Sequence, residues 1–162
     1  LELFEDAPEA PDAFVICCGG GGLTAGCALA AEALSPATAL FCVEPEYYDD
    51  HARSLASGER ETADTSRPSL CDALLTPSPG ELTFPINQRL LRGGLVVTEA
   101  EVLHAMHFAF RVLKLVVEPG GAVALAALLA GKVPPEYERV GVMLSGGNVD
   151  PELFTRVLAG KD

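Results

Sequence analysis

Four consecutive glycines, Gly19 to Gly22, follow a short apolar run and precede an Ala-rich segment. Glycine accepts positive φ and lets a ligand approach the backbone closely. Successive amide groups at the start of a helix can therefore form a nest for a phosphate group. The GxGxxG spacing of dinucleotide sites is met only loosely, and no Gly-Lys-Ser/Thr segment of a P-loop follows. The loop thus indicates either a phosphate nest of another kind or a tight strand-to-helix turn.

A second glycine loop, Ser145-Gly146-Gly147-Asn148, follows the apolar segment 139–144. In open α/β sheets, ligands bind at the carboxyl ends of the strands. If both apolar runs are strands of one sheet, the two glycine loops lie at this edge and can hold a ligand between them. Two ordinary turns remain the alternative.

The elements that must position these loops follow from the alternation of apolar runs with Ala-rich or amphipathic segments. Residues 13–43 read as strand, glycine loop, helix and strand, the crossover unit of α/β proteins. We expect strands over 13–18, 38–43, 95–97 and 139–144, and helices over 23–34, 98–116, 119–130 and 151–158. Residues 57–85 are predicted to form a long, partly ordered surface segment. The predicted fold class is α/β: an open, mostly parallel sheet with helices on both faces.

The helix predicted from Thr98 begins with a capping box, because Glu101 stands three residues later. Apolar residues recur along this helix at spacings of four and three, which predicts a single buried face. That face would consist of Val102, Met106, Ala109, Leu113 and Val116. The polar residues of the other side are expected to be solvated, namely His104, Arg111 and Lys114.

The composition disfavours several classes of partner. A formal net charge of −12, spread along the chain, argues against nucleic acid and against anionic membrane surfaces. Any anionic ligand must therefore be bound by local backbone dipoles. No segment reaches the length of a membrane span. The five cysteines are odd in number and form no CxxC pair, which predicts free thiols in a cytoplasmic protein.

Four motifs together resemble a known family. They are Gly19-Gly20-Gly21-Gly22-Leu23-Thr24-Ala25-Gly26, Val43-Glu44-Pro45, Glu118-Pro119-Gly120-Gly121-Ala122 and Leu144-Ser145-Gly146-Gly147-Asn148. Their order and approximate spacing are similar to those of fold-type-II pyridoxal-phosphate (PLP) enzymes, above all serine/threonine dehydratases and serine racemases. The segment 80–85 also resembles a stretch of these dehydratases. The resemblance implies a tryptophan synthase β-like sheet, of which residues 1–162 would be the C-terminal part of the PLP-binding large domain.

The resemblance implies a role for each matched position. Gly19, Gly20, Gly21, Gly22 and Leu23 would bind the PLP phosphate, and Gly146 would also contact the cofactor. Ser145 would hydrogen-bond the pyridine nitrogen, and a neutral hydroxyl there would leave that nitrogen largely unprotonated and the ring a weaker electron sink. Glu118 would either lie near the cofactor or cap the helix that begins at Pro119.

The implied reaction is β-elimination of L-serine or L-threonine to a 2-oxo acid and ammonia. Two alternatives remain open: a serine racemase-type enzyme, and a non-catalytic module that binds PLP or another phosphate. The ligand would be a small amino acid, with neither nucleic acid nor membrane as partner, and homodimerisation is implied for the full-length protein.

A cation site is implied as well. Glu44, Tyr48 and Asp50 match the family's divalent-cation ligands, with Tyr48 contributing its backbone carbonyl. Such an oxygen donor set suits Mg²⁺ or Ca²⁺. An acid-rich helix N-terminus, which the helix dipole favours, is the alternative.

The family's chemistry needs a lysine that forms a Schiff base with PLP, and no lysine here has its Ser-x-Lys-x-Arg-Gly context. The three present are Lys114, Lys132 and Lys161. We therefore assign no catalytic residue and expect that lysine, together with a smaller domain and further strands, upstream of the tetraglycine loop. Residues 1–6 read as the tail of a helix already under way, so we expect the chain to begin within a larger protein. Ala73 stands where relatives have a glycine beside the cofactor, which puts close backbone approach there in question.

Overall fold

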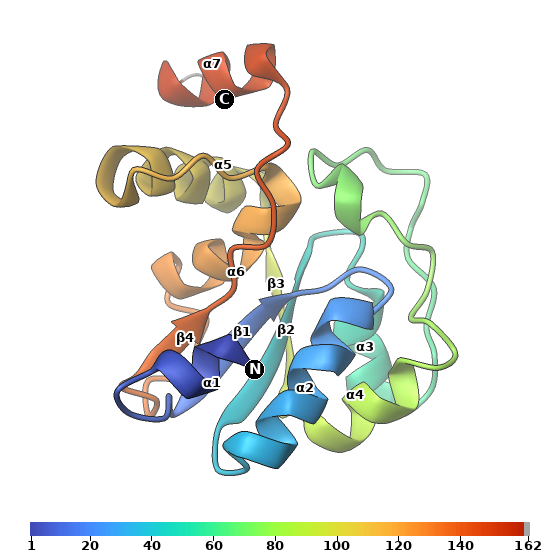
Figure 1. Cartoon of the computed structure of the whole chain (residues 1–162). Coiled ribbons are helices and arrows are strands. Elements are labelled where there is room, and N and C mark those ends of the chain that lie inside the picture. Colours follow the sequence, from blue (N-terminus) through green and yellow to red (C-terminus); the bar gives the residue numbers. More distant parts are fainter. Residues whose placement is uncertain (161–162) are drawn as a thin grey trace.

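A computed structural model describes residues 1–160 and contains one parallel sheet in this range (Figure 1). Its strands are β1 (Ala13–Cys17), β2 (Ala39–Pro45), β3 (Gly93–Val97) and β4 (Val140–Val142). The strand order is β3-β2-β1-β4, and every pair is parallel. The predicted fold class is therefore confirmed, with strand ends displaced by a few residues.

The central position of β1 explains its uninterrupted apolar sequence. Ala13 pairs with Ala39 of β2 on one side and with Val140 of β4 on the other. All five residues of β1 are buried, as expected of a parallel strand covered on both faces. Because all strands run the same way, the segments that follow β1 and β4 leave the sheet at the same edge.

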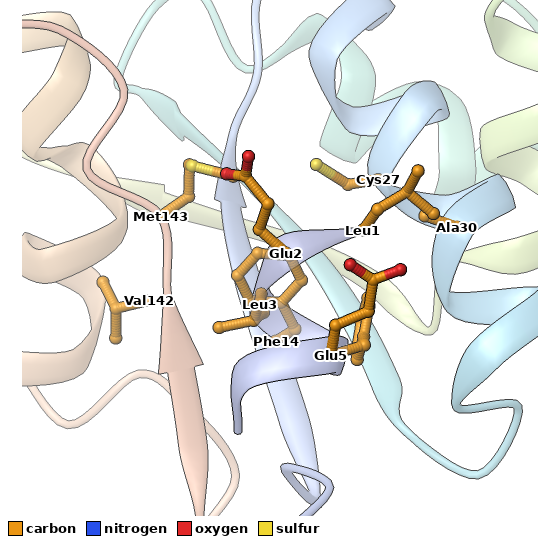
Figure 2. Close-up of a pocket in the computed structure, with 10 residues that line it drawn as sticks. Leu1, Glu2, Leu3, Glu5, Phe14, Cys27, Ala30, Val142 and Met143 are labelled. Carbon is orange, nitrogen blue, oxygen red and sulfur yellow. The ribbon is translucent and has the colours of Figure 1, made fainter. Parts of the chain in front are cut away.

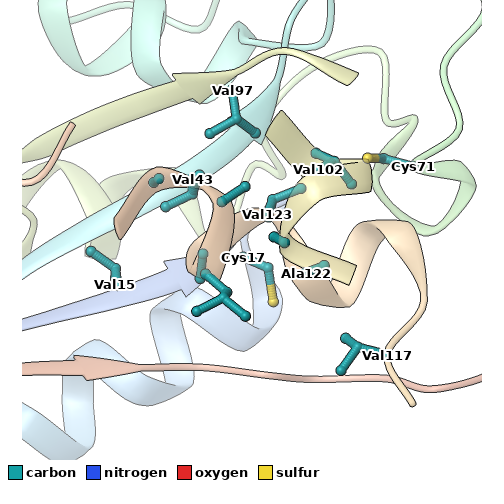
Figure 3. Packing of buried hydrophobic residues seen from close by; sticks show 14 of the residues in the cluster. Val15, Cys17, Val43, Cys71, Val97, Val102, Val117, Ala122 and Val123 are labelled. Carbon is teal, nitrogen blue, oxygen red and sulfur yellow. The ribbon is translucent and has the colours of Figure 1, made fainter. Parts of the chain in front are cut away.

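Helices cover both faces of the sheet (Figure 1). On one face Phe14 and Ile16 pack against Ala28 and Ala31 of α2 (Gly22–Leu34). On the other face the alternate residues Val15 and Cys17 belong to a larger cluster, which Figure 3 shows. The remaining helices are α1 (Glu2–Asp6), α3 (Asp50–Ser57), α4 (Phe84–Leu90), α5 (Glu99–Phe108), α6 (Pro119–Leu129) and α7 (Pro151–Leu158).

The α6 helix lies in the middle of the larger cluster. Its residues from Pro119 to Ala127 are all buried, so it has no polar face. Ala122 and Val123 pack with Val43 and Val102, which joins α6 to the sheet and to α5 (Figure 3). The small side chains of α6 allow this close approach, which fixes Glu118 at its N-terminus relative to the strand ends.

The α5 helix confirms its predicted start and corrects its predicted end. Thr98 Oγ1 accepts from the Glu101 amide at 3.3 Å, and the Thr98 amide donates to Glu101 Oε2 at 2.7 Å, which completes the capping box. The α-helix stops at Phe108, and a π-helical turn (Ala109–Leu113) follows and ends at Lys114, with φ 63°. A π-turn contains an extra residue, so the 3.6-residue periodicity is lost after it.

The buried face predicted for this helix is accordingly only half right. Val102, Met106 and Ala109 are fully buried, whereas Leu113 and Val116, beyond the start of the π-turn, are 43% and 49% exposed. The residues predicted to be solvated, His104, Arg111 and Lys114, are exposed.

The segment 57–85 is mostly irregular, as predicted, apart from a short 3₁₀ helix (Asp72–Leu74). Helix α4 was not predicted; it begins at Phe84 with Pro85 in its first turn, a position that proline favours. Residues 2–6 are helical as expected, and Phe4 of α1 packs edge-on against Phe14 at 6.0 Å. None of the helices within residues 1–160 combines the length and apolar character needed to cross a bilayer.

Candidate functional site

The tetraglycine loop connects the end of β1 with the start of α2. Gly21 is the N-cap residue of α2 and has φ 85°, in the left-handed region that glycine favours. A Cβ atom at Gly21 would lie 2.6 Å from His51 Cε1 and 2.7 Å from Asn87 Nδ2. Both the backbone angle and the lack of space therefore require glycine at this position.

The carbonyl groups of the loop are bonded to the segment that contains Gly80 and Thr83. Gly20 O accepts from Thr83 Oγ1 at 2.6 Å and from the Gly80 amide at 3.1 Å. Gly21 O accepts from Asn87 Nδ2 at 3.3 Å. The stretch 80–85, which resembles a dehydratase motif, thus holds the glycine loop in place through hydrogen bonds to its carbonyl groups.

The amide groups of the loop are available on the other side. Among residues 1–160, the amides of Gly22, Leu23 and Thr24 in the first turn of α2 have no hydrogen-bond acceptor. Gly22 and Leu23 are exposed, and a Cβ atom at Gly22 would meet no atom within 4 Å, whereas Thr24 is buried. Free amides at a helix N-terminus attract an anion, and this arrangement fits the phosphate of PLP.

The second glycine loop follows β4 and lies beside the first. Ser145 Oγ is 3.0 Å from Cys17 Sγ, the last residue of β1, and accepts its hydrogen bond. The hydroxyl of Ser145 remains exposed, with its own hydrogen free to donate. The structure therefore brings the two predicted cofactor loops together at the carboxyl ends of adjacent strands.

Glu118 fixes the backbone of the second loop. Its amide donates to Gly146 O at 3.0 Å, and its Oε2 accepts from the Asn148 amide at 2.8 Å. A Cβ atom at Gly146 would lie 2.4 Å from Glu118 Oε1. Glu118 is the N-cap residue of α6, as expected, although its side chain makes no capping bond; its nearness to the cofactor stays a prediction.

Ala73 fits where a glycine was expected because another glycine faces it. A Cβ atom at Gly120 would lie 3.3 Å from the Ala73 Cβ. A Cβ atom at Gly19 would lie 3.2 Å from Leu74 Cα. The 3₁₀ turn that contains Ala73 and Leu74 therefore lies against the first loop on one side and the start of α6 on the other.

The predicted cation ligands lie where β2 leads into α3. Glu44 Oε1 accepts from the His51 amide at 3.0 Å and Glu44 Oε2 from the Ala52 amide at 2.7 Å. Burial raises the pKa of Glu44 well above its usual range. Burial also raises the pKa of Asp50 to about 6, and neither of its carboxylate oxygens has a partner in the described part of the chain.

The unpartnered Asp50 oxygens are compatible with a cation ligand, and Asp50 also lies in the first turn of α3, as the alternative of an acid-rich helix N-terminus expects. A fully buried carboxylate with no hydrogen bond is costly, and a metal ion would compensate it. Tyr48, the third predicted ligand, is buried, and its phenol donates to Arg67 O at 3.0 Å, which leaves its carbonyl as the ligand to be tested.

Several residues of this region were not identified from the sequence. Cys18, Glu44 and His51 are all buried, and one ligand atom of each lies within 4.8 Å of the others. A hydrogen bond with Cys42, followed by the nearby His51, lowers the pKa of the Cys18 thiol to about 5. The one signal that could have indicated these residues is that Cys18 directly follows β1 and that His51 lies in the first turn of α3, the helix after β2, at the ligand-binding edge.

The two described lysines are committed to other contacts. Lys132 donates to Val96 O and pairs with Glu101, both at 2.7 Å. Lys114 donates to Arg111 O on the exposed π-turn. The third lysine, Lys161, lies outside the described residues.

An apolar hollow of about 640 Å³ lies under α1, separate from the glycine loops (Figure 2). Phe14, Cys27 and Met143 help to line it, together with Leu1 and Leu3. None of the predicted cofactor or metal residues lines this hollow.

Comparison with known proteins gives consistent matches. The family model described as pyridoxal-phosphate dependent enzyme matches residues 1–146. A serine racemase of Dictyostelium discoideum is 39% identical over 161 residues, covering 98% of this chain and 49% of the relative. An L-threo-3-hydroxyaspartate ammonia-lyase of a Pseudomonas species is 40% identical over 149 residues, covering 92% of this chain and 46% of the relative. The chain therefore spans about half the length of these curated relatives.

Solved structures show the same architecture. A threonine deaminase from the organism abbreviated T.th. is 43% identical with a TM-score of 0.81, covering 87% of this chain and 50% of that one. The maize serine racemase is 35% identical with a TM-score of 0.86, covering 98% of this chain and 49% of that one. The parallel sheet with its two glycine loops is thus the fold-type-II arrangement.

Proposed function

The chain belongs to the family of pyridoxal-phosphate dependent enzymes, in its fold-type-II serine/threonine dehydratase and serine racemase group, and we propose that it is the cofactor-binding part of a serine/threonine ammonia-lyase. The reaction proposed is β-elimination of L-serine or L-threonine to a 2-oxo acid and ammonia. Relatives named threonine deaminase and L-threonine ammonia-lyase support this choice.

The observation that carries the proposal is the set of open amides at the start of α2. The carbonyls of Gly20 and Gly21 are bonded to the protein, while the amides of Gly22 and Leu23 belong to exposed residues and have no acceptor among residues 1–160. A chain with net charge −12 holds a phosphate by such local dipoles and not by its overall field. Gly19 to Leu23 are therefore proposed to bind the phosphate of PLP.

Ser145 is proposed to hold the pyridine nitrogen. Because Ser145 Oγ accepts from the Cys17 thiol, its hydroxyl hydrogen is left to donate to that nitrogen. When bound, PLP supplies an electron sink for the electrons left on Cα after its proton is removed. A neutral partner keeps this sink weak, which favours rapid loss of a β-hydroxyl over long storage of charge.

Glu118 and Gly146 are proposed to shape the same side of the site. The Glu118 carboxylate holds the Asn148 amide, and the lack of a side chain at Gly146 leaves room for that carboxylate. This contact keeps Ser145 at one fixed distance from the glycine loop. The lysine for the Schiff base and the substrate-binding residues are proposed to lie upstream, since about half of each relative precedes or follows the matched part.

A divalent cation is proposed at Glu44, the Tyr48 carbonyl and Asp50. The support is the pair of buried Asp50 oxygens without a partner among the described residues. Mg²⁺ or Ca²⁺ would neutralise the two carboxylates, and water would complete the shell. The cation would stabilise the connection between β2 and α3 without touching substrate.

Serine racemisation is the second candidate function, because several relatives at 36–39% identity carry the name serine racemase. A non-catalytic PLP-binding module is the third, because neither described lysine lies free at the site. A homodimer in the cytoplasm is proposed as the setting in each case; all five cysteines are free, as a reducing compartment requires.

The test is a product assay on the purified native protein with PLP. L-serine and L-threonine are supplied separately, and 2-oxo acid, ammonia and D-serine are measured. Ammonia with a 2-oxo acid supports the lyase, and D-serine without a 2-oxo acid supports the racemase. Borohydride reduction followed by peptide mapping identifies the lysine. Saturable PLP binding with neither product nor a trapped lysine supports the non-catalytic PLP-binding module.

A further inference from the structure

Three metal-ligating side chains converge beneath the tetraglycine loop, and the proposed function uses only Glu44 among them. One ligand atom each of Cys18, Glu44 and His51 lies within 4.8 Å of the others. Their residues are 2%, 1% and 0% exposed. Ligand atoms about 2.0–2.3 Å from a zinc ion fit within such a group after small side-chain movements.

The fold explains why these residues meet. Cys17 pairs with Val43 across the adjacent parallel strands, so Cys18 and Glu44 follow at the same level of the sheet. The Glu44 carboxylate then accepts from the amides of His51 and Ala52, which holds the start of α3 over the strand ends. A carboxylate oxygen with one hydrogen bond retains a lone pair for a metal.

His51 has one ring nitrogen that is buried and has no hydrogen-bond partner among the described residues. Its Nε2 lies 2.9 Å from Asn87 Nδ2, whereas its Nδ1 has no partner within residues 1–160. A histidine that binds metal through Nδ1 carries its proton on Nε2, where a second residue accepts it. Asn87 can do so by turning its amide, because Asn87 Oδ1 also lacks a partner in this range.

A nucleophilic Cys–His pair is excluded by burial. The His51 ring is fully buried and the Cys18 thiol nearly so. A nucleophile must reach its substrate, and these atoms cannot. A bound ion needs no such access, because it can be taken up as the protein folds.

We propose that Cys18, His51 and Glu44 bind a Zn²⁺-class transition-metal ion beneath the glycine loop. Thiolate and imidazole ligands select such ions over Mg²⁺ and Ca²⁺, so this set differs in chemistry from the oxygen set of Glu44, Tyr48 and Asp50. The two sets share Glu44, and therefore one ion excludes the other. The three side chains supply one ligand atom each, and water would complete the shell.

A metal ion bound at this site would change the hydrogen bonding of the glycine loop. Asn87 donates to the Gly21 carbonyl at 3.3 Å and contacts His51 through the same amide nitrogen. Turning the amide to accept from His51 Nε2 removes the bond to Gly21. The metal is thus coupled to the loop that is proposed to hold the phosphate, although its detection requires no PLP.

The experiment uses Co²⁺ as a spectroscopic probe and Zn²⁺ in competition. The purified native protein is stripped with a chelator and titrated with Co²⁺. We expect one equivalent to bind with a thiolate-to-cobalt charge-transfer band in the near ultraviolet, and Zn²⁺ to displace it. Cys18→Ser should abolish the band and weaken Zn²⁺ binding by on the order of 100-fold or more, since even outer-shell changes cost 10–100-fold.

The matched control is Cys27→Ser, a half-buried cysteine on α2 outside the cluster, which should leave band and affinity unchanged. A Co²⁺ complex without the band, or a band that survives Cys18→Ser, would overturn the proposal, as would the absence of binding. Zinc X-ray absorption on the unmodified protein decides the case if Cys18→Ser does not fold. One sulfur at about 2.3 Å with nitrogen and oxygen at about 2.0 Å is expected; a shell of oxygen alone contradicts it.

Discussion

The carbonyl side of the tetraglycine loop, here called the underside, is hydrogen-bonded to the protein. The amide side at the start of α2, here called the upper side, is open. On the underside, the Gly20 and Gly21 carbonyls accept from Thr83 and Asn87, and His51 fills the space below Gly21. On the upper side, the Gly22 position meets no atom within 4 Å. Adjacent glycines therefore differ: Gly21 is required by the fold, whereas Gly22 is proposed to be required by the ligand.

This difference separates stability from binding. Substitutions on the underside should change the free energy of unfolding, because they disturb packed and buried polar groups. Substitutions on the upper side should leave stability nearly unchanged and weaken only the phosphate contact.

Gly21→Ala should destabilise the protein by about 3 kcal/mol. The left-handed backbone angle costs about 1–2 kcal/mol for a residue with a side chain, and a methyl group 2.6 Å from His51 adds overpacking. Urea unfolding followed by circular dichroism measures the change. A loss below about 1 kcal/mol would mean that the underside is loosely packed.

The buried Asp50 should make stability depend on pH in the metal-free protein. Its pKa rises from 3.8 to about 6 on folding, so the folded chain binds more protons than the unfolded chain between these values. The free energy of unfolding should therefore fall by about 2 kcal/mol as the pH rises from about 4 to about 7.

Asp50→Asn is the matched variant for this prediction, because it keeps the side-chain size and removes the titration. Unfolding of both proteins is measured across this pH range in the presence of a chelator. Parallel pH curves for the two proteins would show that Asp50 does not titrate as described. Added Mg²⁺ or Ca²⁺ should restore stability to the unmodified protein at neutral pH and leave Asp50→Asn less affected.

Thr83→Val should cost about 1 kcal/mol, since it removes the hydroxyl that donates to the Gly20 carbonyl at 2.6 Å while keeping a similar shape. Thr83→Ser keeps the hydroxyl and should be milder. Thermal melts of the three proteins give the order. Equal melting temperatures for the valine and serine variants would show that the Thr83 hydroxyl does not stabilise the loop.

Gly22→Ala should change the free energy of unfolding by less than about 1 kcal/mol, and alanine is the better helix former. Gly26→Ala is the control in the same helix, because a Cβ atom there also meets nothing within 4 Å. Both variants should melt within a few degrees of the unmodified protein. A large loss for Gly22→Ala alone would show that the upper side is packed against the protein.

Much of the fold could be predicted from local patterns in the sequence. The continuous apolar run of β1, the capping box at Thr98 and the position of Pro119 each specify an element through neighbours within four residues. The π-turn after Phe108 could not be predicted, because a 3.6-residue pattern continues through Leu113 and Val116 although both are exposed.

The site was predictable to the extent that glycine marks it. The two glycine loops and Ser145 were correctly placed at one edge of the sheet, since parallel strands bring their carboxyl ends together, while their role in binding the cofactor stays a prediction. The residues that hold the loop carbonyls were not predicted, because Asn87 and Thr83 lie 66 and 63 residues along the sequence from the glycines that they contact. Cys18 and His51 likewise meet only in the folded chain, and a single cysteine or histidine carries no such signal.

The most direct test of the central claim is the affinity for PLP of the purified native protein and of its Gly22→Ala and Gly26→Ala variants, measured by absorbance titration. We expect saturable binding by the unmodified protein, equal binding by Gly26→Ala, and an affinity at least about 10-fold lower for Gly22→Ala, equivalent to about 1.4 kcal/mol. Equal affinity in all three proteins, or no binding at all, would contradict the assignment of the open amides to the cofactor phosphate.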